Sequence, residues 1–166
     1  CLSGLRGFSR PTGMVELEMV ENIMAQMGKW LVYVNLYFQG EPYLHKGMDD
    51  LVRECKKNGV YTSTSTNAHH LNPERSKDLV ASGLDRLIIS IDGTTQETYS
   101  AYRVGGSLEK VLEGTRNVLE ARKSSGSSKP FVVWQFLVVK PNEHQVEDIK
   151  TLAKEYNVDE VVIKTA

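Results

Sequence analysis

Short apolar runs alternate with longer amphipathic stretches along the 166 residues of the chain. The apolar runs have the length and residue types of β-strands, whereas the stretches between them repeat apolar residues at helical spacing. We predict strands at 30–38, 59–66, 86–91, 131–139 and 159–164. We predict helices near 15–27, 44–58, 73–82, 106–123 and 143–156. Regular alternation of strand and helix is typical of βαβ units and predicts a parallel sheet.

The boundaries of these elements have their own signals. The helix at 106–123 places its apolar residues on one stripe, namely Leu108, Val111, Leu112, Val118 and Leu119. Gly59 and Gly83 stand where helices end, a position that favours glycine. The Ser-rich segment 123–130 fits a loop from helix to strand better than a domain boundary. We therefore expect one domain over residues 1–166.

The predicted strands carry a polar face, which a parallel sheet packed on both sides would lack. Alternate side chains on a strand point to opposite faces. The polar positions are Tyr33, Asn35, Tyr37 and Gln39 around the first strand, Ser63, Ser65 and Asn67 on the second, Ser90 and Asp92 on the third and Gln135 on the fourth. A barrel filled with aliphatic side chains would not show this pattern. We expect a barrel, complete or partial, that surrounds a polar ligand.

Composition excludes several classes of partner. The formal net charge of −1 gives no reason to expect nucleic acid or an anionic membrane surface. The chain has no apolar run long enough for a membrane span and no signal-peptide pattern at its start. Cys1 and Cys55 are too few for a disulfide framework, so a cytoplasmic location is the simplest expectation. Because the chain starts at Cys1 without Met and stops after an apolar run, we expect it to be part of a longer protein.

Five segments taken together resemble the radical S-adenosylmethionine (radical SAM) superfamily. They are CLSGL at 1–5, FQGEP at 38–42, STSTNA at 63–68, ISIDG at 89–93 and YRVGG at 102–106. The resemblance extends over nearly the whole chain, and it is strongest for members with a C-terminal SPASM-type extension, which is absent here. It implies an α/β fold, a partial (β/α) barrel of which the chain holds about five of six strands, the first being missing.

The same resemblance implies the chemistry. Members hold a 4Fe-4S cluster on a C-x3-C-x2-C loop, and Cys1 looks like the third of these ligands. Three thiolates leave one iron open for the amino and carboxylate groups of S-adenosylmethionine (SAM), whose reductive cleavage gives a 5′-deoxyadenosyl radical that abstracts hydrogen. The electron donor would be a flavodoxin or ferredoxin. The substrate stays open between peptide, protein and small molecule, with peptide or protein modification favoured, and the fragment itself is expected to be inactive.

The resemblance also implies a set of cofactor-binding residues. Gln39, Gly40, Glu41 and Pro42 match the GGEP motif of the family, with Gln39 as a departure at the first position. Glu41 would accept a hydrogen bond from the methionine ammonium, so we expect Glu41→Gln to weaken SAM binding with little effect on thermal stability. The remaining predicted cofactor-binding residues are Ser65, Asn67, Ser90, Asp92, Arg103 and Gln135.

Each of these residues also has an ordinary structural interpretation. Glu41 is a normal residue for the first turn of a helix, Asn67 for a turn, and Asp92 for a turn before glycine. Arg103 has the alternative of a solvated side chain, and Gln135 fits equally well as a buried amide that is satisfied by neighbouring strands.

Two other features suggest structural roles. Cys55 lies inside a helical pattern and fits a small buried residue. His69-His70 fits a loop surface better than a metal pair, because adjacent residues point apart. Two rival functions remain. One is a nonenzymatic ligand- or partner-binding module on the same scaffold. The other is a phosphate-binding βα barrel, although no Gly-rich phosphate loop is evident.

Overall fold

The structure is a computed structural model that describes residues 13–165, so the predicted cluster ligand Cys1 lies outside the described residues. The strands are β1 (Tyr33–Asn35), β2 (Tyr61–Thr66), β3 (Arg86–Ser90), β4 (Phe131–Val138) and β5 (Glu160–Thr165). The α-helices are α1 (Leu17–Met27), α2 (Met48–Lys57), α3 (Pro73–Ala81), α4 (Gln96–Tyr102), α5 (Leu108–Ser124) and α6 (Val146–Tyr156). Single 3-10 turns occur at η2 (Gly28–Trp30), η3 (Pro42–Leu44) and η4 (Glu143–Gln145).

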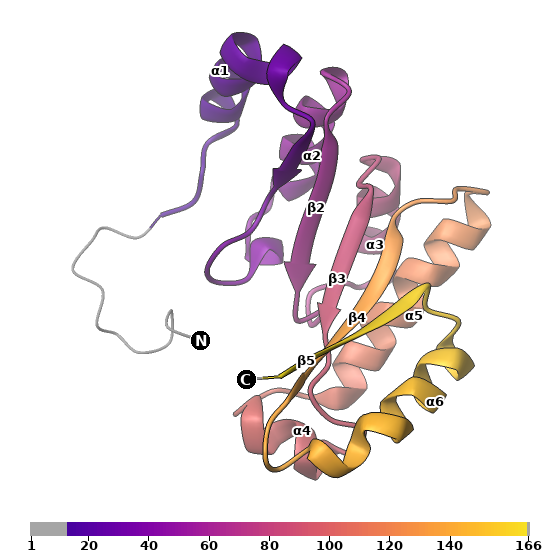
Figure 1. Cartoon of the computed structure of the whole chain (residues 1–166). Helices are drawn as coiled ribbons and strands as arrows, with labels where there is room; N and C mark the ends of the chain where they lie inside the picture. The colour runs from indigo at the N-terminus through magenta and orange to yellow at the C-terminus, as the bar shows by residue number, and fades with distance from the viewer. Residues whose placement is uncertain (1–12, 166) are drawn as a thin grey trace.

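The five strands form one parallel sheet in the order β1-β2-β3-β4-β5, as the sequence predicts. Figure 1 shows α2, α3 and α5 on one side of the sheet, with α6 beside β5 and the opposite face not covered by helices. The short helix α4 lies at the carboxyl ends of the strands in the same view. This arrangement leaves one face and one end of the sheet open to a ligand.

A single apolar core fills the space between the sheet and its helices. Leu87 and Ile89 of β3 and Trp134 of β4 are fully buried on the helical side. The indole nitrogen of Trp134 donates a 3.1 Å hydrogen bond to the hydroxyl of Thr115 on α5, so this large side chain is buried without an unpaired polar atom. The predicted stripe on α5 is confirmed, since its members are buried or packed against the core. Cys55 is a free, buried core residue.

The corner that follows β2 is tightly packed against α5. Ala68 has a φ of +61°, a left-handed conformation that is uncommon for residues other than glycine. A Cβ atom added at Gly114 of α5 would lie 2.4 Å from the backbone oxygen of Ala68. Only glycine permits this approach, so the pair fixes the distance between the end of β2 and the helix.

The first strand is shorter than predicted. Regular pairing covers only Tyr33–Asn35, although the Leu36 amide still donates a 2.8 Å hydrogen bond to the Ser63 carbonyl. The predicted apolar face is 82% exposed at Val32 and 86% exposed at Phe38. The prediction of a strand over 30–38 was therefore wrong at both ends, because Trp30 belongs to η2 and the residues after Asn35 leave the regular strand.

The helix boundaries differ in smaller ways. The segment 44–58 begins its α-helix only at Met48, after the separate turn η3 that starts at Pro42. The seven-residue helix α4 was not predicted from the sequence. Its N-cap residue Thr95 accepts a 3.3 Å hydrogen bond from the Thr98 amide. Gly59 and Gly83 follow α2 and α3 with positive φ, which confirms the predicted helix ends.

Two buried carboxylates have pKa values that are shifted in opposite directions. Asp85, just before β3, accepts hydrogen bonds from Lys56 Nζ at 2.6 Å, from the Thr62 amide at 2.8 Å and from Lys129 Nζ. Burial alone would raise the pKa of Asp85, but the hydrogen bonds from Lys129 and Lys56 outweigh it and lower the pKa to about 2. Burial raises the pKa of Asp49 on α2 despite the positive charge of Arg75.

None of the helices within residues 13–165 has the length and apolar character needed to cross a membrane.

Candidate functional site

A polar cavity of about 310 Å³ lies at the carboxyl ends of the first three strands. It is lined by Tyr37, Gly40, Glu41, Ser65, Thr66, Asn67, Ser90 and Arg103. These residues come from the turn after β1, the end of β2, the end of β3 and the position just after α4. Six of them are predicted cofactor-binding residues, and the volume falls at the lower end of the roughly 300–1,000 Å³ typical of small-molecule sites.

Glu41 ties the turn after β1 to the end of β2. Its Oε1 atom accepts hydrogen bonds from the Thr66 hydroxyl at 2.6 Å and the Tyr43 amide at 3.1 Å, and its Oε2 atom accepts from the Asn67 amide at 2.8 Å. A carboxylate has about four acceptor positions. One position, on Oε2, therefore remains for a ligand donor in the cavity.

These contacts correct one expectation about Glu41. The sequence-based prediction was that a neutral amide in this position would leave stability nearly unchanged. Glu41 instead satisfies three donors of the protein itself, and an amide group has only one acceptor oxygen for them. The side chain has a structural role in addition to any role toward a ligand.

Two serine hydroxyls face the cavity from neighbouring strands. Ser65 lies near the end of β2, and Ser90 is the last residue of β3. The strand register pairs Ser65 with Ile88, two residues before Ser90, so both serines belong to the same face of the sheet. Within residues 13–165 neither hydroxyl has a hydrogen-bond partner, so both remain available to a ligand.

Arg103 is the positively charged wall of the cavity. It is the C-cap residue of α4, and its Nε atom donates a 2.6 Å hydrogen bond to Oδ2 of Asp92. Its two terminal nitrogens make no hydrogen bond to any residue between 13 and 165. The side chain is 32% exposed. Because the guanidinium is held through Nε, its two terminal nitrogens form a fork that can donate two hydrogen bonds to a ligand carboxylate.

Asp92, which was predicted to bind the cofactor, is not among the residues that line the cavity, and its contact with a cofactor remains a prediction. The side chain is 1% exposed. Its second oxygen, Oδ1, accepts a 2.7 Å hydrogen bond from the Leu137 amide beyond the end of the β3–β4 pairing. Asp92 therefore holds Arg103 in place and joins it to β4.

Three other predicted residues lie outside the polar cavity. Gln39 and Pro42 line a neighbouring apolar cavity of about 450 Å³ between α1, β1 and α2, and Glu41 and Tyr37 border both cavities. Gln135 pairs with Ser90 in the β3–β4 register, and its backbone oxygen accepts a 3.0 Å hydrogen bond from the Ile91 amide. Their proposed contacts with a cofactor remain predictions.

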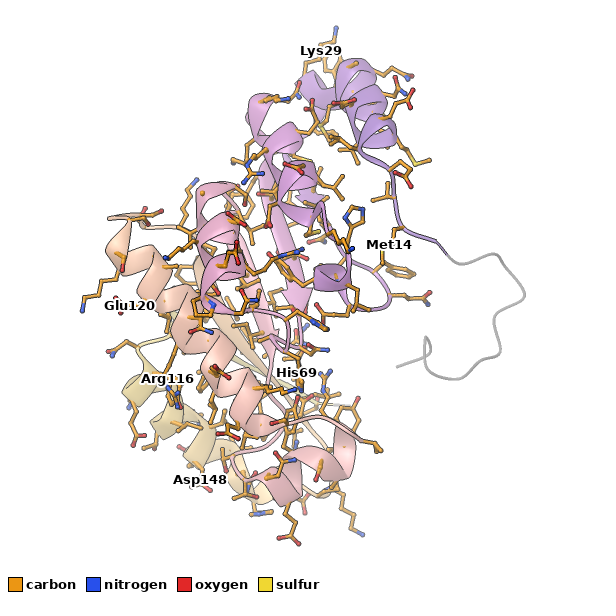
Figure 2. The ribbon with its side chains drawn as sticks, turned by 180° about the vertical axis from the view of Figure 1, so that it is seen from behind. Met14, Lys29, His69, Arg116, Glu120 and Asp148 are labelled. Carbon is orange, nitrogen blue, oxygen red and sulfur yellow. The ribbon has the colours of Figure 1, made fainter. Side chains whose placement is uncertain are left out.

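Two residues that line the cavity, and one that contacts the lining residue Asn67, were not among the predicted ones. Tyr37 lies on the polar face that strand alternation identifies, so the sequence contained a signal for it. Thr66 belongs by alternation to the opposite face of β2. His69, read as a loop-surface residue, lies between the end of β2 and the beginning of α5, as Figure 2 shows. The hydrogen bond from the Ser107 amide to its ring joins residues that are 38 positions apart in the sequence.

The cavity combines groups that match a zwitterionic ligand. A guanidinium fork suits a carboxylate, and the remaining acceptor position of Glu41 suits an ammonium group. The Ser65 and Ser90 hydroxyls add neutral donors and acceptors. Within residues 13–165 no three side chains of His, Cys, Asp or Glu come together to hold a metal ion. The described residues therefore offer a site for an amino acid moiety but no ligand set for a cluster.

Comparison with protein-family models decides the family. The model described as the radical SAM superfamily matches residues 5–155. The chain belongs to the radical SAM superfamily. Members of this superfamily use a 4Fe-4S cluster together with SAM.

Curated relatives within the radical SAM superfamily include enzymes with different named activities. A GTP 3′,8-cyclase of Peptoclostridium acidaminophilum is 34% identical over 121 residues, which cover 72% of this chain and 36% of that protein. The mycofactocin maturase MftC of Mycobacterium ulcerans is 30% identical over 157 residues, or 94% of this chain and 40% of that protein. The chain thus spans well under half the length of the relatives it matches.

Solved structures confirm the fold. Streptococcus suis SuiB bound to S-adenosylmethionine aligns with a TM-score of 0.74 and 16% identity, covering 95% of this chain and 35% of that chain. SuiB bound to the precursor peptide SuiA aligns with a TM-score of 0.74 and 14% identity, covering 95% of this chain and 34% of that chain. The predicted partial barrel is therefore the observed architecture.

Proposed function

We propose that this chain is the SAM-binding part of a radical SAM enzyme that modifies a peptide or protein, with SPASM-type relatives as its subgroup. The observation that carries the SAM site is the convergence of Arg103 and Glu41 on one cavity. The free fork of Arg103 receives the methionine carboxylate, and the open position on Glu41 Oε2 receives the ammonium. Ser65 and Ser90 contact the remainder of the ligand.

The bound cofactor pair supplies a carbon-centred radical that removes hydrogen from substrate, after one electron arrives from a flavodoxin- or ferredoxin-type donor. The residues of this chain bind and orient SAM at the strand ends and do not themselves carry the electron. Cys1 is proposed as one cluster ligand on the resemblance alone.

The peptide assignment draws on two similarities. A 30% identical relative is named as a maturase, and the peptide-bound SuiB structure shares the fold. The 34% identical cyclase is named for GTP, a nucleotide, so a nucleotide is the substrate class against which the proposal has to be tested.

The test is anaerobic reconstitution of the full-length protein with iron and sulfide, followed by incubation with SAM and dithionite. We expect a 4Fe-4S absorption spectrum and formation of 5′-deoxyadenosine. Addition of GTP and of candidate peptides in separate reactions then asks which one accelerates 5′-deoxyadenosine formation. A reconstituted protein that neither binds SAM nor forms 5′-deoxyadenosine would favour the nonenzymatic binding module, and acceleration by GTP alone would overturn the peptide assignment.

A further inference from the structure

We propose that His69 is a positioning residue for the polar cavity, acting as a neutral imidazole that joins the end of β2 to the loop carrying Arg103. The inference rests on the proposed function, because it takes the cavity as the SAM site. It concerns a residue that the sequence pattern assigned only to a loop surface.

Both ring nitrogens of His69 have a hydrogen-bond partner. Its backbone amide donates a 3.0 Å hydrogen bond to the side-chain oxygen of Asn67, and Nδ1 lies 2.8 Å from the Asn67 carbonyl oxygen. On the far side, the Ser107 amide donates a 2.9 Å hydrogen bond to Nε2. Asn67 itself lines the cavity and donates its amide to Glu41.

These partners select one protonation state. A backbone amide only donates, so Nε2 facing Ser107 has to be the unprotonated nitrogen. A carbonyl oxygen only accepts, so Nδ1 facing Asn67 has to carry the proton. The neutral ring protonated at Nδ1 satisfies both contacts, whereas a proton on Nε2 would place two N–H groups against each other.

The segment that His69 holds is the segment that carries Arg103. Ser107 is the N-cap residue of α5, and the loop from Arg103 to Gly106 runs directly into it. The loop is closed by a 2.9 Å hydrogen bond from the Gly106 amide to the Arg103 carbonyl. Asp92 holds Arg103 at the start of this loop, and His69 holds Ser107 at its end. Gln96 also holds this loop, because its side-chain amide donates to the Gly106 carbonyl at 3.0 Å and accepts from the Leu108 amide at 2.8 Å. In our proposal the ties of Asp92 and His69 orient the guanidinium fork within the loop that Gln96 supports.

A second tie between the same two regions provides a matched control. The side-chain amide of Asn117, further along α5, donates a 2.8 Å hydrogen bond to the Leu71 carbonyl. Asn117 does not line the cavity, so this contact anchors α5 without touching the loop of Arg103. Loss of the Asn117 bond is expected to affect stability and not ligand affinity.

The variants separate the two hydrogen bonds of the ring. His69→Phe keeps a planar ring and loses both bonds, whereas His69→Gln keeps an acceptor near the position of Nε2 for Ser107. We expect the reconstituted His69→Phe protein to bind SAM about tenfold more weakly by titration calorimetry. His69→Gln should recover most of this affinity, and Asn117→Ala should bind SAM like the wild type.

Nuclear magnetic resonance of the imidazole supplies a readout that needs no activity. The ¹³C and ¹⁵N shifts of His69 in the wild-type protein should report the ring protonated at Nδ1. A ring protonated at Nε2, or equal SAM affinity in wild type and His69→Phe, would overturn the inference while leaving the SAM site intact. If His69→Phe does not fold, the SAM affinities of His69→Gln and Asn117→Ala are compared instead. Weaker SAM binding by His69→Gln than by Asn117→Ala would contradict the expectation that glutamine replaces the acceptor of the imidazole. Wild-type protein that fails to bind SAM refutes the proposed function instead.

Discussion

Asp92 and Arg103 share a 2.6 Å hydrogen bond between a buried carboxylate oxygen and the Nε atom of the guanidinium. The other oxygen of Asp92 receives the Leu137 amide. The carboxylate thus leaves the terminal nitrogens of Arg103 for the cavity. The two carboxylate oxygens of Asp92 accept from different donors, so replacing one oxygen by an amide nitrogen can disrupt one contact while the other is kept.

The Asp92→Asn substitution is expected to weaken SAM binding without abolishing the fold. The amide oxygen still accepts from Leu137, whereas the amide nitrogen faces the Nε–H of Arg103, so two donors oppose each other. Loss of a charged hydrogen bond is worth about 1.5–3 kcal/mol, roughly ten- to more than a hundredfold in the dissociation constant. Calorimetric titration of the reconstituted protein with SAM measures the effect.

A double substitution tests whether Asp92 acts through Arg103. In an Arg103→Met background, Asp92→Asn should cause no further loss of SAM affinity. Additive losses in the double variant would mean that Asp92 contributes by a separate route.

The Glu41→Gln substitution is expected to lower thermal stability as well as SAM affinity. It replaces a carboxylate that serves Thr66, Tyr43 and Asn67 by a group with one acceptor oxygen. An unsatisfied donor costs about 1–3 kcal/mol. Ser90→Ala is the control, because the Ser90 hydroxyl has no partner among residues 13–165. Calorimetric melting of both variants should show the larger decrease for Glu41→Gln, and the reverse order would contradict the assigned contacts.

Asp85 is expected to make the fold sensitive to acid between about pH 4 and pH 2. Its pKa of about 2 in the folded protein lies below the ordinary 3.8, so the ionised group stabilises the fold above pH 4 and this stabilisation is lost as the pH falls. Asp85→Asn should unfold more easily at neutral pH, by about 3 kcal/mol, since Lys56 and Lys129 lose their partner.

Urea unfolding at a series of pH values measures this contribution. The free energy of unfolding of Asp85→Asn should change less than that of the wild type between pH 4 and pH 2. Parallel curves for the two proteins would show that Asp85 is not the group that titrates.

Asp49 is expected to behave in the opposite sense. Burial raises the pKa of Asp49 in the folded protein, so the ionised carboxylate is disfavoured there at neutral pH. The neutral carboxyl group contributes its full stabilisation of the fold below pH 3.8, and this contribution is lost as the pH rises. Its Oδ1 atom is buried without a hydrogen-bond partner. Asp49→Asn should therefore melt at a higher temperature than the wild type at pH 7. The difference should disappear below pH 3.8, and a lower melting temperature at pH 7 would contradict the prediction.

The order and direction of the strands were predictable because they depend on hydrophobic period and on the alternation of strands with helices. The ends of β1 were not. The run from Trp30 to Phe38 alternates like a buried strand, yet Trp30 and Phe38 are 74% and 86% exposed. Periodicity records which side chains could share a face, and it does not record whether a neighbouring strand is present to pair with the backbone.

The site was predictable where strand alternation still applied. Ser65 and Ser90 lie within strands, and both face the cavity as expected. Asp92 was assigned to the same face by counting two residues from Ser90, but β3 ends at Ser90, so alternation no longer determines its direction. His69 was missed because its partner Ser107 is distant in sequence, and no local pattern reveals such a contact.

The close approach of Ala68 and Gly114 links two positions that would otherwise vary independently during evolution. The left-handed backbone at Ala68 turns the chain so that Asn67 faces the cavity while His69 faces α5, and Gly114 leaves room for that turn. A larger residue at either position would displace the wall of the ligand site by moving the helix. An alignment of close homologues should therefore show small residues at both positions together, with substitutions at one accompanied by substitutions at the other.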